Sequence, residues 1–335
     1  MHLFMSLDKS DLLVEAENLV MRFPVRGGQW IRPVDDVSFS IRRGEVLALV
    51  GESGSGKTTI GRSLLRILEP AQGTIRVAGS DVTHIKGKAL VRYRREAQMI
   101  FQDPFGSLNP IKTVEAHLTF PIKKHRGGNA DRVSAVVDEL LTRVGLTPVD
   151  ETRQKFPHEL SGGQRQRLAI ARALAVQPTF LVADELISML DVSIRAGILK
   201  LMNELKAEFR LSFLYITHDL ASARYFGDRI MVLYAGRIME TAASRELVRN
   251  PSHPYTRLLL AATPGSQHHG KLPERVNEPP DLSEARRGCP FATRCLYATD
   301  ECRETMPPMT EIEPGHQVAC YHPQTGAIAV ERATI

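Results

Sequence analysis

A glycine-rich loop between a buried strand and a helix constrains this chain more than any other feature. The apolar run VLALV predicts a strand, and the loop GESGSGKT at 51–58 follows it directly. Apolar residues at helical spacing then predict a helix over 59–68. The backbone N–H groups of such a loop can surround phosphate oxygens, and the dipole of the following helix favours their negative charge. We therefore expect an α/β fold with a phosphate site at the carboxyl end of a parallel strand.

Individual residues of this loop have distinct expected roles. Lys57 should reach the β- and γ-phosphate oxygens, and the Thr58 hydroxyl should bind Mg²⁺. A glycine loop can arise by chance, but its place between a strand and a helix favours phosphate binding. The predicted nucleotide-binding residues of the loop are Gly51, Glu52, Ser53, Gly54, Ser55, Gly56, Lys57, Thr58 and Thr59.

Polar residues that follow other apolar runs supply the remaining chemistry. The run FLVAD predicts a buried strand that ends on Asp184, which can hold Mg²⁺ through its water shell. The next residue, Glu185, can align and polarise an attacking water. Gln102 follows the run MIF and can contact both Mg²⁺ and water, and His218 follows the run LSFLYIT and can bond the γ-phosphate or the water. An acidic pair or a lone histidine at a strand end is otherwise usually structural.

A second anion-binding helix start predicts a working unit of two chains. Ser161, Gly162 and Gly163 open a helix, and the free N–H groups of a helix start bind anions. One nucleotide needs only one phosphate loop. The second anion-binding helix start is explained if two chains face each other head to tail. Each chain would then hold a nucleotide between its own phosphate loop and its partner's Ser-Gly-Gly. A glycine-rich helix start that binds no ligand is the alternative.

The pattern along the chain predicts several regions. The alternating segments VDDVSFSI and TIRVAG predict half-exposed antiparallel strands on the N-terminal side. Residues of about 103–176 are mainly helical, with one amphipathic helix that ends near Gly145. A stretch at 263–287 rich in proline and glycine indicates a linker. We expect a catalytic domain over 12–250 and a C-terminal extension over 251–335.

Composition excludes several classes of protein. With 335 residues, 43% of them apolar and 24% charged, the chain has an ordinary globular balance rather than a disordered or fibrous one. Its apolar runs fall far short of the ~18 residues that span a bilayer, and its N-terminus lacks the pattern of a secretion signal. The net charge of +5 comes from scattered residues, so we expect no nucleic-acid partner. We expect an intracellular protein whose membrane part, if any, is another subunit.

All four cysteines lie in the C-terminal tail, at Cys289, Cys295, Cys302 and Cys320. In an intracellular chain this clustering favours a metal site over disulfides. Four thiolates can bind Zn²⁺ or an iron–sulfur cluster, and four free thiols without a metal are the third alternative. The spacing C-x₅-C-x₆-C-x₁₇-C lacks the CxxC pairs common in structural zinc sites.

Taken together, these motifs resemble the ATP-binding subunits of ABC transporters over nearly the whole chain. In the expected order they are the Walker A loop at Gly51, the Q-loop at Gln102, the signature Leu160 to Gln164, Walker B ending on Asp184 and Glu185, and the switch histidine His218. The resemblance implies a P-loop NTPase core of the RecA type, an N-terminal antiparallel β subdomain and an inserted helical subdomain. It also implies ATP and Mg²⁺ as ligands, with Mg²⁺ held through Thr58, Gln102 and Asp184. The residues expected to serve the partner's nucleotide are Ser161, Gly162, Gly163, Gln164, and, in the D-loop, Ser188 and Asp191.

Two positions depart from the family pattern or match it weakly. Pro and Thr usually follow the catalytic glutamate, whereas Leu186 and Ile187 stand here. Proline stiffens the turn that aims the glutamate, so we predict that Leu186→Pro leaves ATPase activity the same or higher. Trp30, with Phe23 behind it, is the candidate for the aromatic residue that stacks on adenine, although its loop is longer than usual and a tryptophan on an edge strand is more often packing.

Further segments resemble the peptide/nickel importer group. They are FQDPFGSLNP, YITHDLASARYFGDRI, HPYTRLLLAATP and the cysteine tail, which in this group implies a [4Fe–4S] cluster, with Zn²⁺ as the alternative. The resemblance implies a peripheral subunit at the cytoplasmic face of the membrane. Its expected partners are an identical or paralogous ATP-binding subunit, two transmembrane permease subunits and, indirectly, an extracytoplasmic solute-binding protein. Peptides are the expected solutes, and some relatives import oligosaccharides.

Two other functions remain as alternatives. A soluble ABC ATPase of DNA repair or translation would carry a second cassette or a long coiled-coil insertion, and this sequence has a single Walker A motif. An exporter motor is often fused to its membrane domain and lacks the cysteine tail.

Overall fold

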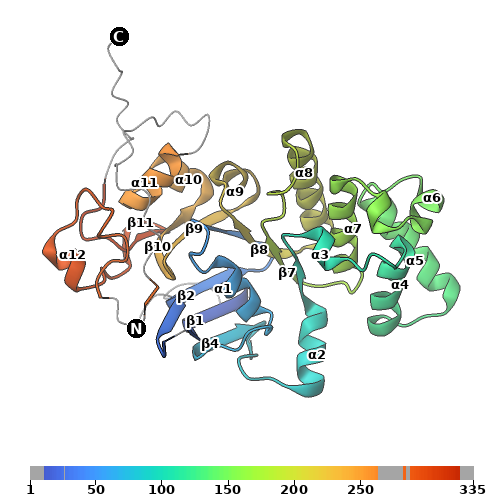
Figure 1. Cartoon of the computed structure of the whole chain (residues 1–335), viewed down its shortest axis with the longest axis horizontal. Helices are drawn as coiled ribbons and strands as arrows, with labels where there is room; N and C mark the ends of the chain where they lie inside the picture. The colour runs from blue at the N-terminus through green and yellow to red at the C-terminus, as the bar shows by residue number, and fades with distance from the viewer. Residues whose placement is uncertain (1–10, 26, 263–281, 284–286, 325–335) are drawn as a thin grey trace, which may run out of the picture. The chain divides into compact units, whose positions relative to one another are not determined.

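The computed structural model describes residues 11–25, 27–262, 282–283 and 287–324 (Figure 1). The chain divides into two compact units. The first unit combines residues up to 84 with residues from 215 onward, and the second unit contains residues 85–214. Most of the predicted linker at 263–287 lies outside the described residues. Within the described residues, no helix is both long and apolar enough to cross a membrane.

The first unit contains the predicted antiparallel sheet. Its strands are β1 (Leu12–Pro24), β2 (Trp30–Arg42), β4 (Gln72–Val77) and β5 (Ser80–Asp81), in the order β2-β1-β4-β5. β1 pairs antiparallel with both β2 and β4. Alternating residues of β1 such as Val14 and Ala16 are fully buried, so one face of the sheet packs on the core. The expected antiparallel N-terminal subdomain is therefore confirmed.

A mixed set of strands carries the glycine-rich loop in the same unit. The central strand β3 (Val46–Val50) is buried along its whole length and pairs parallel with β9 (Arg229–Tyr234). Beyond β9 the order continues through β10 (Arg237–Ala243) and β12 (His316–Val318) to β11 (Thr310–Glu313), all antiparallel. The C-terminal hairpin β11–β12 thus extends the sheet that supports the loop.

Short helices complete the first unit. They are α1 (Lys57–Leu64), α9 (Leu220–Phe226), α10 (Ser244–Arg249), α11 (Pro254–Ala261) and α12 (Asp300–Glu304). α1 follows the glycine-rich loop directly, so the predicted order of strand, loop and helix is confirmed. α11 and α12 belong to the segment that bears the cysteines or leads to it.

The second unit contains two parallel strands and most of the helices. β6 (Ala97–Ile100) pairs parallel with β7 (Phe180–Asp184). β8 (Ser212–Thr217) begins in this unit and ends in the first. The helices are α2 (Gly87–Glu96), α3 (Pro104–Ser107), α4 (Val114–His125), α5 (Ala130–Arg143), α6 (Val149–Gln154), the 3₁₀ turn η2 (Pro157–Glu159), α7 (Gly162–Leu174) and α8 (Val192–Phe209).

Local sequence explains the bounds of α5, the helix expected to end near Gly145. Asn129 caps its start, because the side-chain oxygen accepts the N–H of Arg132 at 3.1 Å. Val137 and Leu141 lie on its buried face, in line with the predicted amphipathic pattern. Gly145 has a φ of 69°, a left-handed conformation that ends the helix at low cost.

Candidate functional site: a phosphate loop and a carboxylate turn

The glycine-rich loop closes around the ammonium group of Lys57. The Lys57 Nζ donates to the carbonyl oxygens of Gly51 and Glu52, each at 2.7 Å, and lies 3.5 Å from the Ser55 Oγ. The side chain is 5% exposed, so its charge is held inside the loop. A charge surrounded by loop oxygens at the start of a helix can exchange those partners for phosphate oxygens.

Two glycines of the loop are required by close backbone approaches. A Cβ atom on Gly51 would lie 2.2 Å from the carbonyl oxygen of Leu233, in β9. A Cβ atom on Gly56 would lie 1.9 Å from the carbonyl oxygen of Pro33, in β2, and Gly56 has a φ of 106°. Any side chain at either position would displace the loop from the strands that support it.

Glu52 connects this loop to the C-terminal segment. Its backbone N–H donates to the Tyr255 hydroxyl at 3.0 Å. Its two carboxylate oxygens accept from the two terminal nitrogens of Arg294, at 2.9 and 3.0 Å. The sequence motif placed Glu52 in the loop but assigned no role to Tyr255 or Arg294. The only available signal was that both lie in segments that resemble the importer group.

The second unit brings Gln102 and Glu185 together. The Gln102 Nε2 donates to the Glu185 Oε2 at 2.9 Å, although 83 residues separate them in the chain. Asp184, the last residue of β7, is buried. The φ of Glu185 is 43°, so the chain turns sharply between the two carboxylates. All three residues were predicted from the sequence, but the contact between Gln102 and Glu185 could be found only from the structure.

The turn after Glu185 contains the D-loop residues. Both the backbone N–H and the hydroxyl of Ser188 donate to the Glu185 carbonyl, at 3.1 and 3.0 Å. Asp191 is exposed and precedes the first turn of α8. Leu186, where the family has proline, is buried. The turn is therefore held by hydrogen bonds and by apolar packing.

The Ser-Gly-Gly segment opens α7 with a reciprocal cap. The Ser161 Oγ accepts the N–H of Gln164 at 3.2 Å, and the Gln164 Oε1 accepts the N–H of Ser161 at 2.9 Å. A Cβ atom on Gly163 would lie 2.9 Å from the side chain of Ile194, in α8. The predicted helix start at Ser161 is present, and Gly163 serves the packing of α7 on α8.

His218 lies at an exposed position between two fixed neighbours. The Thr217 Oγ1 accepts the N–H of Asp219 at 3.0 Å, and the Asp219 carboxylate accepts the N–H groups of Ala221 and Ser222, at 2.9 and 3.3 Å. These contacts cap α9 and hold the backbone at His218.

Trp30 lies on β2, the edge strand of the antiparallel sheet, and is 41% exposed. The guanidinium of Arg22 stacks 4.8 Å from the centre of its ring. Phe23 pairs with Ile31 in the ladder between β1 and β2, whereas Trp30 pairs with Pro24. The ring of Trp30 therefore has an exposed edge position and a cationic neighbour.

The four cysteines line one small cavity of the C-terminal segment, together with His253 and Phe291. None of the four forms a disulfide. Burial raises the pKa of Cys289 to about 12 and that of Cys320 to about 11, and it also raises the pKa of Cys295.

Each of the four sulfurs has a nearby hydrogen-bond donor. Backbone N–H groups serve Cys289 and Cys295, and the N–H of His322 donates to the Cys320 Sγ at 3.3 Å. The hydroxyl of Thr299 lies 3.4 Å from the Cys302 Sγ. The four sulfur positions predicted to act as one site are thus brought together, each beside a polar hydrogen.

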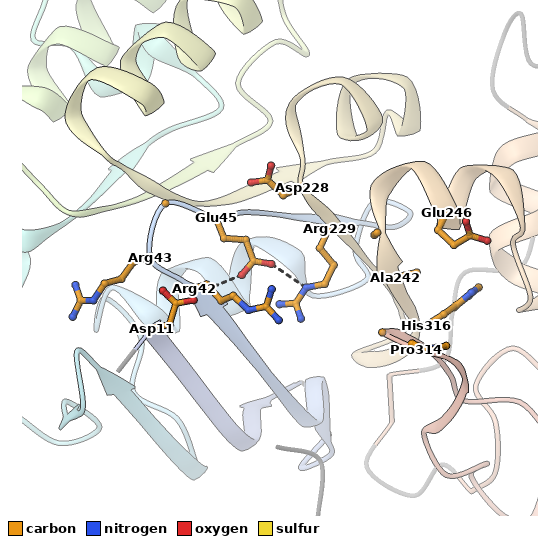
Figure 2. A pocket seen from close by; sticks show the side chains of 13 residues that line it. Asp11, Arg42, Arg43, Glu45, Asp228, Arg229, Ala242, Glu246, Pro314 and His316 are labelled. Carbon is orange, nitrogen blue, oxygen red and sulfur yellow. Dashed lines mark hydrogen bonds and ion pairs between the residues drawn. The ribbon is translucent and has the colours of Figure 1, made fainter. Parts of the chain in front are cut away.

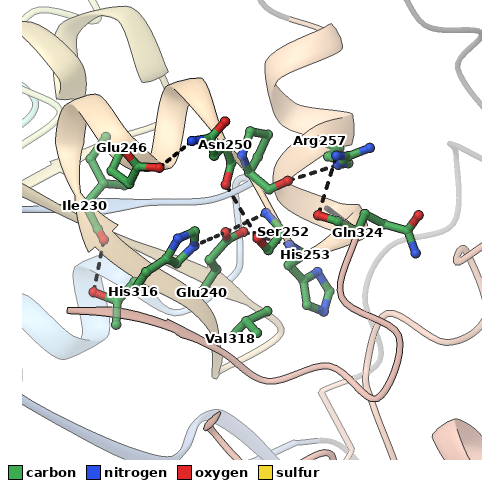
Figure 3. Close-up of polar contacts among 12 residues, drawn as sticks. Ile230, Glu240, Glu246, Asn250, Ser252, His253, Arg257, His316, Val318 and Gln324 are labelled. Atoms are coloured by element: carbon green, nitrogen blue, oxygen red, sulfur yellow. Dashed lines mark hydrogen bonds and ion pairs between the residues drawn. The ribbon is translucent and has the colours of Figure 1, made fainter. Parts of the chain in front are cut away.

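A buried carboxylate joins the C-terminal segment to the sheet. Glu240 of β10 is fully buried and accepts from the N–H groups of Ser252 and His253, at 2.7 and 2.9 Å, and from the His316 Nε2 at 2.7 Å (Figure 3). A buried carboxylate requires such partners. The contacts fix both the start of α11 and the hairpin β11–β12 to β10.

A second cavity, of about 430 Å³, lies where this hairpin meets the turn after β2 (Figure 2). Glu45 lies between two arginines there: it accepts the N–H of Arg42 at 2.7 Å and pairs with the Arg229 guanidinium at 3.1 Å. Glu246, Glu313 and His316 present ligand atoms within 4.8 Å of one another. Glu45 thus forms an ion pair with Arg229 within the first unit.

The predicted site residues are divided between the two units. The first unit holds the phosphate loop and His218, and the second holds Gln102, the Ser-Gly-Gly segment, the two carboxylates and the D-loop. Within the first unit the loop is ordered around Lys57. Within the second unit Gln102 meets Glu185.

Comparison with family sequence models gives two matches. The family described as "ABC transporter" matches residues 34–188. The family described as "Oligopeptide/dipeptide transporter, C-terminal region" matches residues 239–302, which include three of the four cysteines.

Similar proteins match over nearly the full length. The oligopeptide transport ATP-binding protein AppF of Bacillus subtilis is 42% identical over 328 residues, covering 95% of this chain and 99% of that protein. A peptide import ATP-binding protein of Brucella ovis is 44% identical over 311 residues, covering 92% of this chain and 97% of the relative. Among solved structures, the ATP-binding cassette MJ0796, dimeric in a post-hydrolysis state with ADP and Pi, is 28% identical with a TM-score of 0.64, covering 70% of this chain and 99% of that one.

Proposed function

Because this chain belongs to the ATP-hydrolysing subunits of ABC transporters, in the peptide importer group, we propose that it powers the uptake of peptides across the cell membrane. The observation that carries the proposal is the phosphate loop that closes around Lys57. Relatives named for peptide transport match this chain over nearly its whole length. Neither the relatives nor the fold supports the alternative in DNA repair or translation.

ATP and Mg²⁺ are the expected ligands of this family, and the residues present fit them. Mg²⁺ prefers oxygen ligands, and Thr58, Gln102 and Asp184 supply a hydroxyl, an amide and a carboxylate oxygen. We assign to Lys57 the binding of β- and γ-phosphate oxygens, and to Glu185 the alignment and polarisation of the attacking water. The contact between Gln102 and Glu185 supports this assignment, because it holds the carboxylate in one orientation. His218 would then bond the γ-phosphate or the same water.

The pairing of two such subunits is the second part of the proposal. Ser161, Gly162, Gly163 and Gln164, with Ser188 and Asp191, would contact the nucleotide bound to the partner subunit. The reciprocal cap of α7 supports this role, since it holds the exposed Ser161 at the helix start. The dimeric state of the solved cassette MJ0796 is consistent with such pairing. The partner is an identical or a paralogous subunit.

We further propose that the permease subunits dock on the segment from Gln102 to Val114, so that the protein works at the cytoplasmic face of the membrane. Phe105 and Ile111, at 57% and 75% exposure, present apolar surface there. One face of the Phe105 ring is covered by the Arg165 guanidinium at 3.7 Å. Exposed apolar side chains grouped with a cation are typical of surfaces that bind another protein.

The docking surface is tested by a charge substitution. Ile111→Asp should reduce peptide uptake in cells at least ten-fold while ATP hydrolysis by the purified subunit stays within about two-fold of wild type. Ile67→Asp is the matched control, because Ile67 is also exposed but lies in the first unit. Unchanged uptake in the Ile111 variant would show that the permease docks elsewhere.

The four cysteines are proposed to hold a [4Fe–4S] cluster, with Zn²⁺ as the alternative. All four cysteines line the same small cavity of the C-terminal segment, which supports one shared site. The hydrogen-bond donors beside the sulfurs are features that stabilise cluster thiolates. The chain would supply the four thiolate ligands, from Cys289, Cys295, Cys302 and Cys320, and the bound cluster would supply iron and sulfide.

Purification without oxygen separates these alternatives. A brown protein with broad absorption at the boundary of visible and ultraviolet light, with iron and sulfide in equal amounts, supports the cluster. Cys302→Ser should lower the iron content and bleach the colour. A colourless protein that contains one zinc per chain would exclude the cluster, and a colourless protein without metal would leave only thiols.

Genetic complementation tests the function as a whole. Deletion of the gene should abolish the uptake of labelled peptides, and the wild-type gene should restore it, whereas a Glu185→Gln gene should not. Uptake of oligosaccharides should be unaffected. If oligosaccharide uptake is lost instead and peptide uptake remains, the assignment to peptides is wrong.

A further inference from the structure

The phosphate loop is tied to the cysteine-bearing segment by one buried arginine. Arg294 immediately precedes Cys295, and its side chain is 4% exposed. Both of its terminal nitrogens donate to the Glu52 carboxylate, in the two-bond geometry that is the strongest form of such a pair. Glu52 itself is the second residue of the loop that binds phosphate.

Aromatic rings hold Arg294 in this position. Its guanidinium donates to the Tyr234 hydroxyl at 3.2 Å and stacks 5.6 and 5.7 Å from the rings of Tyr234 and Phe291. Tyr234 in turn packs edge-on against Tyr255, whose hydroxyl accepts the backbone N–H of Glu52. The cage therefore fixes both the side chain and the backbone of Glu52.

The charge of Glu52 makes this cage important for nucleotide binding. A free carboxylate in the phosphate loop would repel the triphosphate and could fold inward onto Lys57, whose ammonium already contacts the Glu52 carbonyl at 2.7 Å. Arg294 cancels that charge and draws the carboxylate toward the C-terminal segment. Burial alone lowers the pKa of Arg294, but its hydrogen bonds to Glu52 and Tyr234 and the charge of Glu52 outweigh burial and raise it, so the guanidinium stays charged.

We propose that Arg294 is a positioning residue for ATP binding, through which the folded cysteine segment holds the phosphate loop in its high-affinity form. The proposal rests on the ATP site of the family and is independent of which metal the cysteines hold. Lys57 and Thr58 bind the phosphates directly, whereas Arg294 acts through Glu52.

The test measures ATP affinity and turnover in the full-length protein. Arg294→Met removes the charge and the two hydrogen bonds while keeping much of the apolar stem. It should raise the Kd for a fluorescent ATP analogue about ten-fold, a change of about 1.4 kcal/mol. The KM for ATP should rise similarly, while kcat at saturating ATP stays within two-fold, because Gln102 and Glu185 are unchanged.

A double substitution identifies the cause. Arg294→Met combined with Glu52→Gln removes the uncompensated carboxylate, so the Kd should return to within about three-fold of wild type. Arg294→Lys, which retains the charge but not the paired hydrogen bonds, should fall between wild type and Arg294→Met. Arg303→Met is the matched control: Arg303 lies in the same segment, is exposed, and pairs only with Asp300 among the described ion pairs. It should leave ATP affinity unchanged.

Specific results would overturn the proposal. An unchanged Kd in Arg294→Met would show that the arginine does not position the loop. Additive effects of the two substitutions would show that Glu52 and Arg294 do not act as a pair. The melting temperature and the number of reactive thiols identify a misfolded variant. If Arg294→Met proves misfolded, Arg294→Lys carries the comparison, and an unchanged Kd in that variant would refute the proposal.

Discussion

The backbone at Glu185 carries strain at the residue to which catalysis is assigned. Its φ of 43° is costly for a residue with a side chain, and such strain persists where surrounding contacts maintain it. Here those contacts are the two hydrogen bonds from Ser188 to the Glu185 carbonyl and the hydrogen bond from Gln102 to the carboxylate. These contacts keep Glu185 from relaxing to a less strained conformation.

Substitution of Glu185 by glutamine should separate binding from hydrolysis. The amide has the same shape and can still accept from Gln102, but it cannot take a proton from water. We expect at least a hundred-fold loss of turnover with the Kd for ATP within three-fold of wild type. Single-turnover phosphate release and nucleotide binding measure the two effects. Turnover close to wild type would assign the proton acceptor to another group.

For Leu186, the residue after Glu185, the prediction made from the sequence still stands. Its side chain is 1% exposed, so the apolar leucine is packed where the family has proline. Leu186→Pro exchanges some of this packing for a stiffer turn after Glu185. We expect equal or higher ATP turnover at some cost in melting temperature. A large loss of turnover in a correctly folded variant would contradict this expectation.

At the scale of elements, apolar sequence patterns predicted the buried strands and helices. Continuous apolar runs located β3 and β7, and apolar residues at helical spacing located α5 and α7. These patterns missed β10 and the hairpin β11–β12, whose residues alternate weakly and whose first strand, Thr310–Glu313, is exposed throughout. Glu240 of β10 helps to hold β12 in place, because its carboxylate accepts from His316 of β12 and from Ser252.

The buried histidine of α4, His117, should make the stability of the protein depend on pH. The Nδ1 of His117 donates to the Thr113 carbonyl at 2.8 Å, and its Nε2 accepts the N–H of Asn109 at 2.9 Å. Burial lowers the pKa of His117, opposed by the bond to Thr113 and assisted by the charge of Arg172. The unfolded chain therefore takes up this proton at a higher pH, near 6.5, than the folded chain does. Stability should fall as pH drops below about 6.5, because the unfolded state then binds more protons.

Urea unfolding at pH 7.5 and 5.5 tests this link. His117→Gln keeps a donor and an acceptor without the titration, so its free energy of unfolding should fall less between the two pH values than that of wild type. His125 has a pKa lowered in the same direction but is less buried, so His125→Gln should change the pH dependence less. Equal pH dependence in wild type and the His117 variant would exclude the role of this histidine.

At the scale of the whole molecule, the motifs predicted the family, whereas they could not predict how the chain supports the proposed site. The roles proposed for Lys57, Asp184 and His218 rest on local motifs, because each residue stands at a fixed offset from a strand. The contact between Glu52 and Arg294 spans 242 residues and depends on packing among several aromatic rings. A single sequence contains no local signal for such a contact.

Pairing of subunits also belongs to this scale. ATP should convert Glu185→Gln into a dimer, with this chain alone if the partner is identical and only with the second ATP-binding subunit if the partner is a paralogue. Adding Ser161→Arg should abolish dimer formation while leaving ATP binding within two-fold, because the proposed role of Ser161 is at the partner's nucleotide. Size-exclusion chromatography with ATP measures the dimer. A dimer that survives Ser161→Arg would place the contact elsewhere.

The distance along the chain between Glu52 and Arg294 has a consequence for biosynthesis. At roughly 5–20 residues per second, the ribosome needs about 12–50 s to extend the chain by the 242 positions from Glu52 to Arg294. Throughout that interval the nascent phosphate loop lacks its arginine, although its lysine and glycines are already present. The growing chain should therefore hold nucleotide more weakly until its cysteine-bearing end has folded, so that a truncated product competes less well for ATP than the full chain.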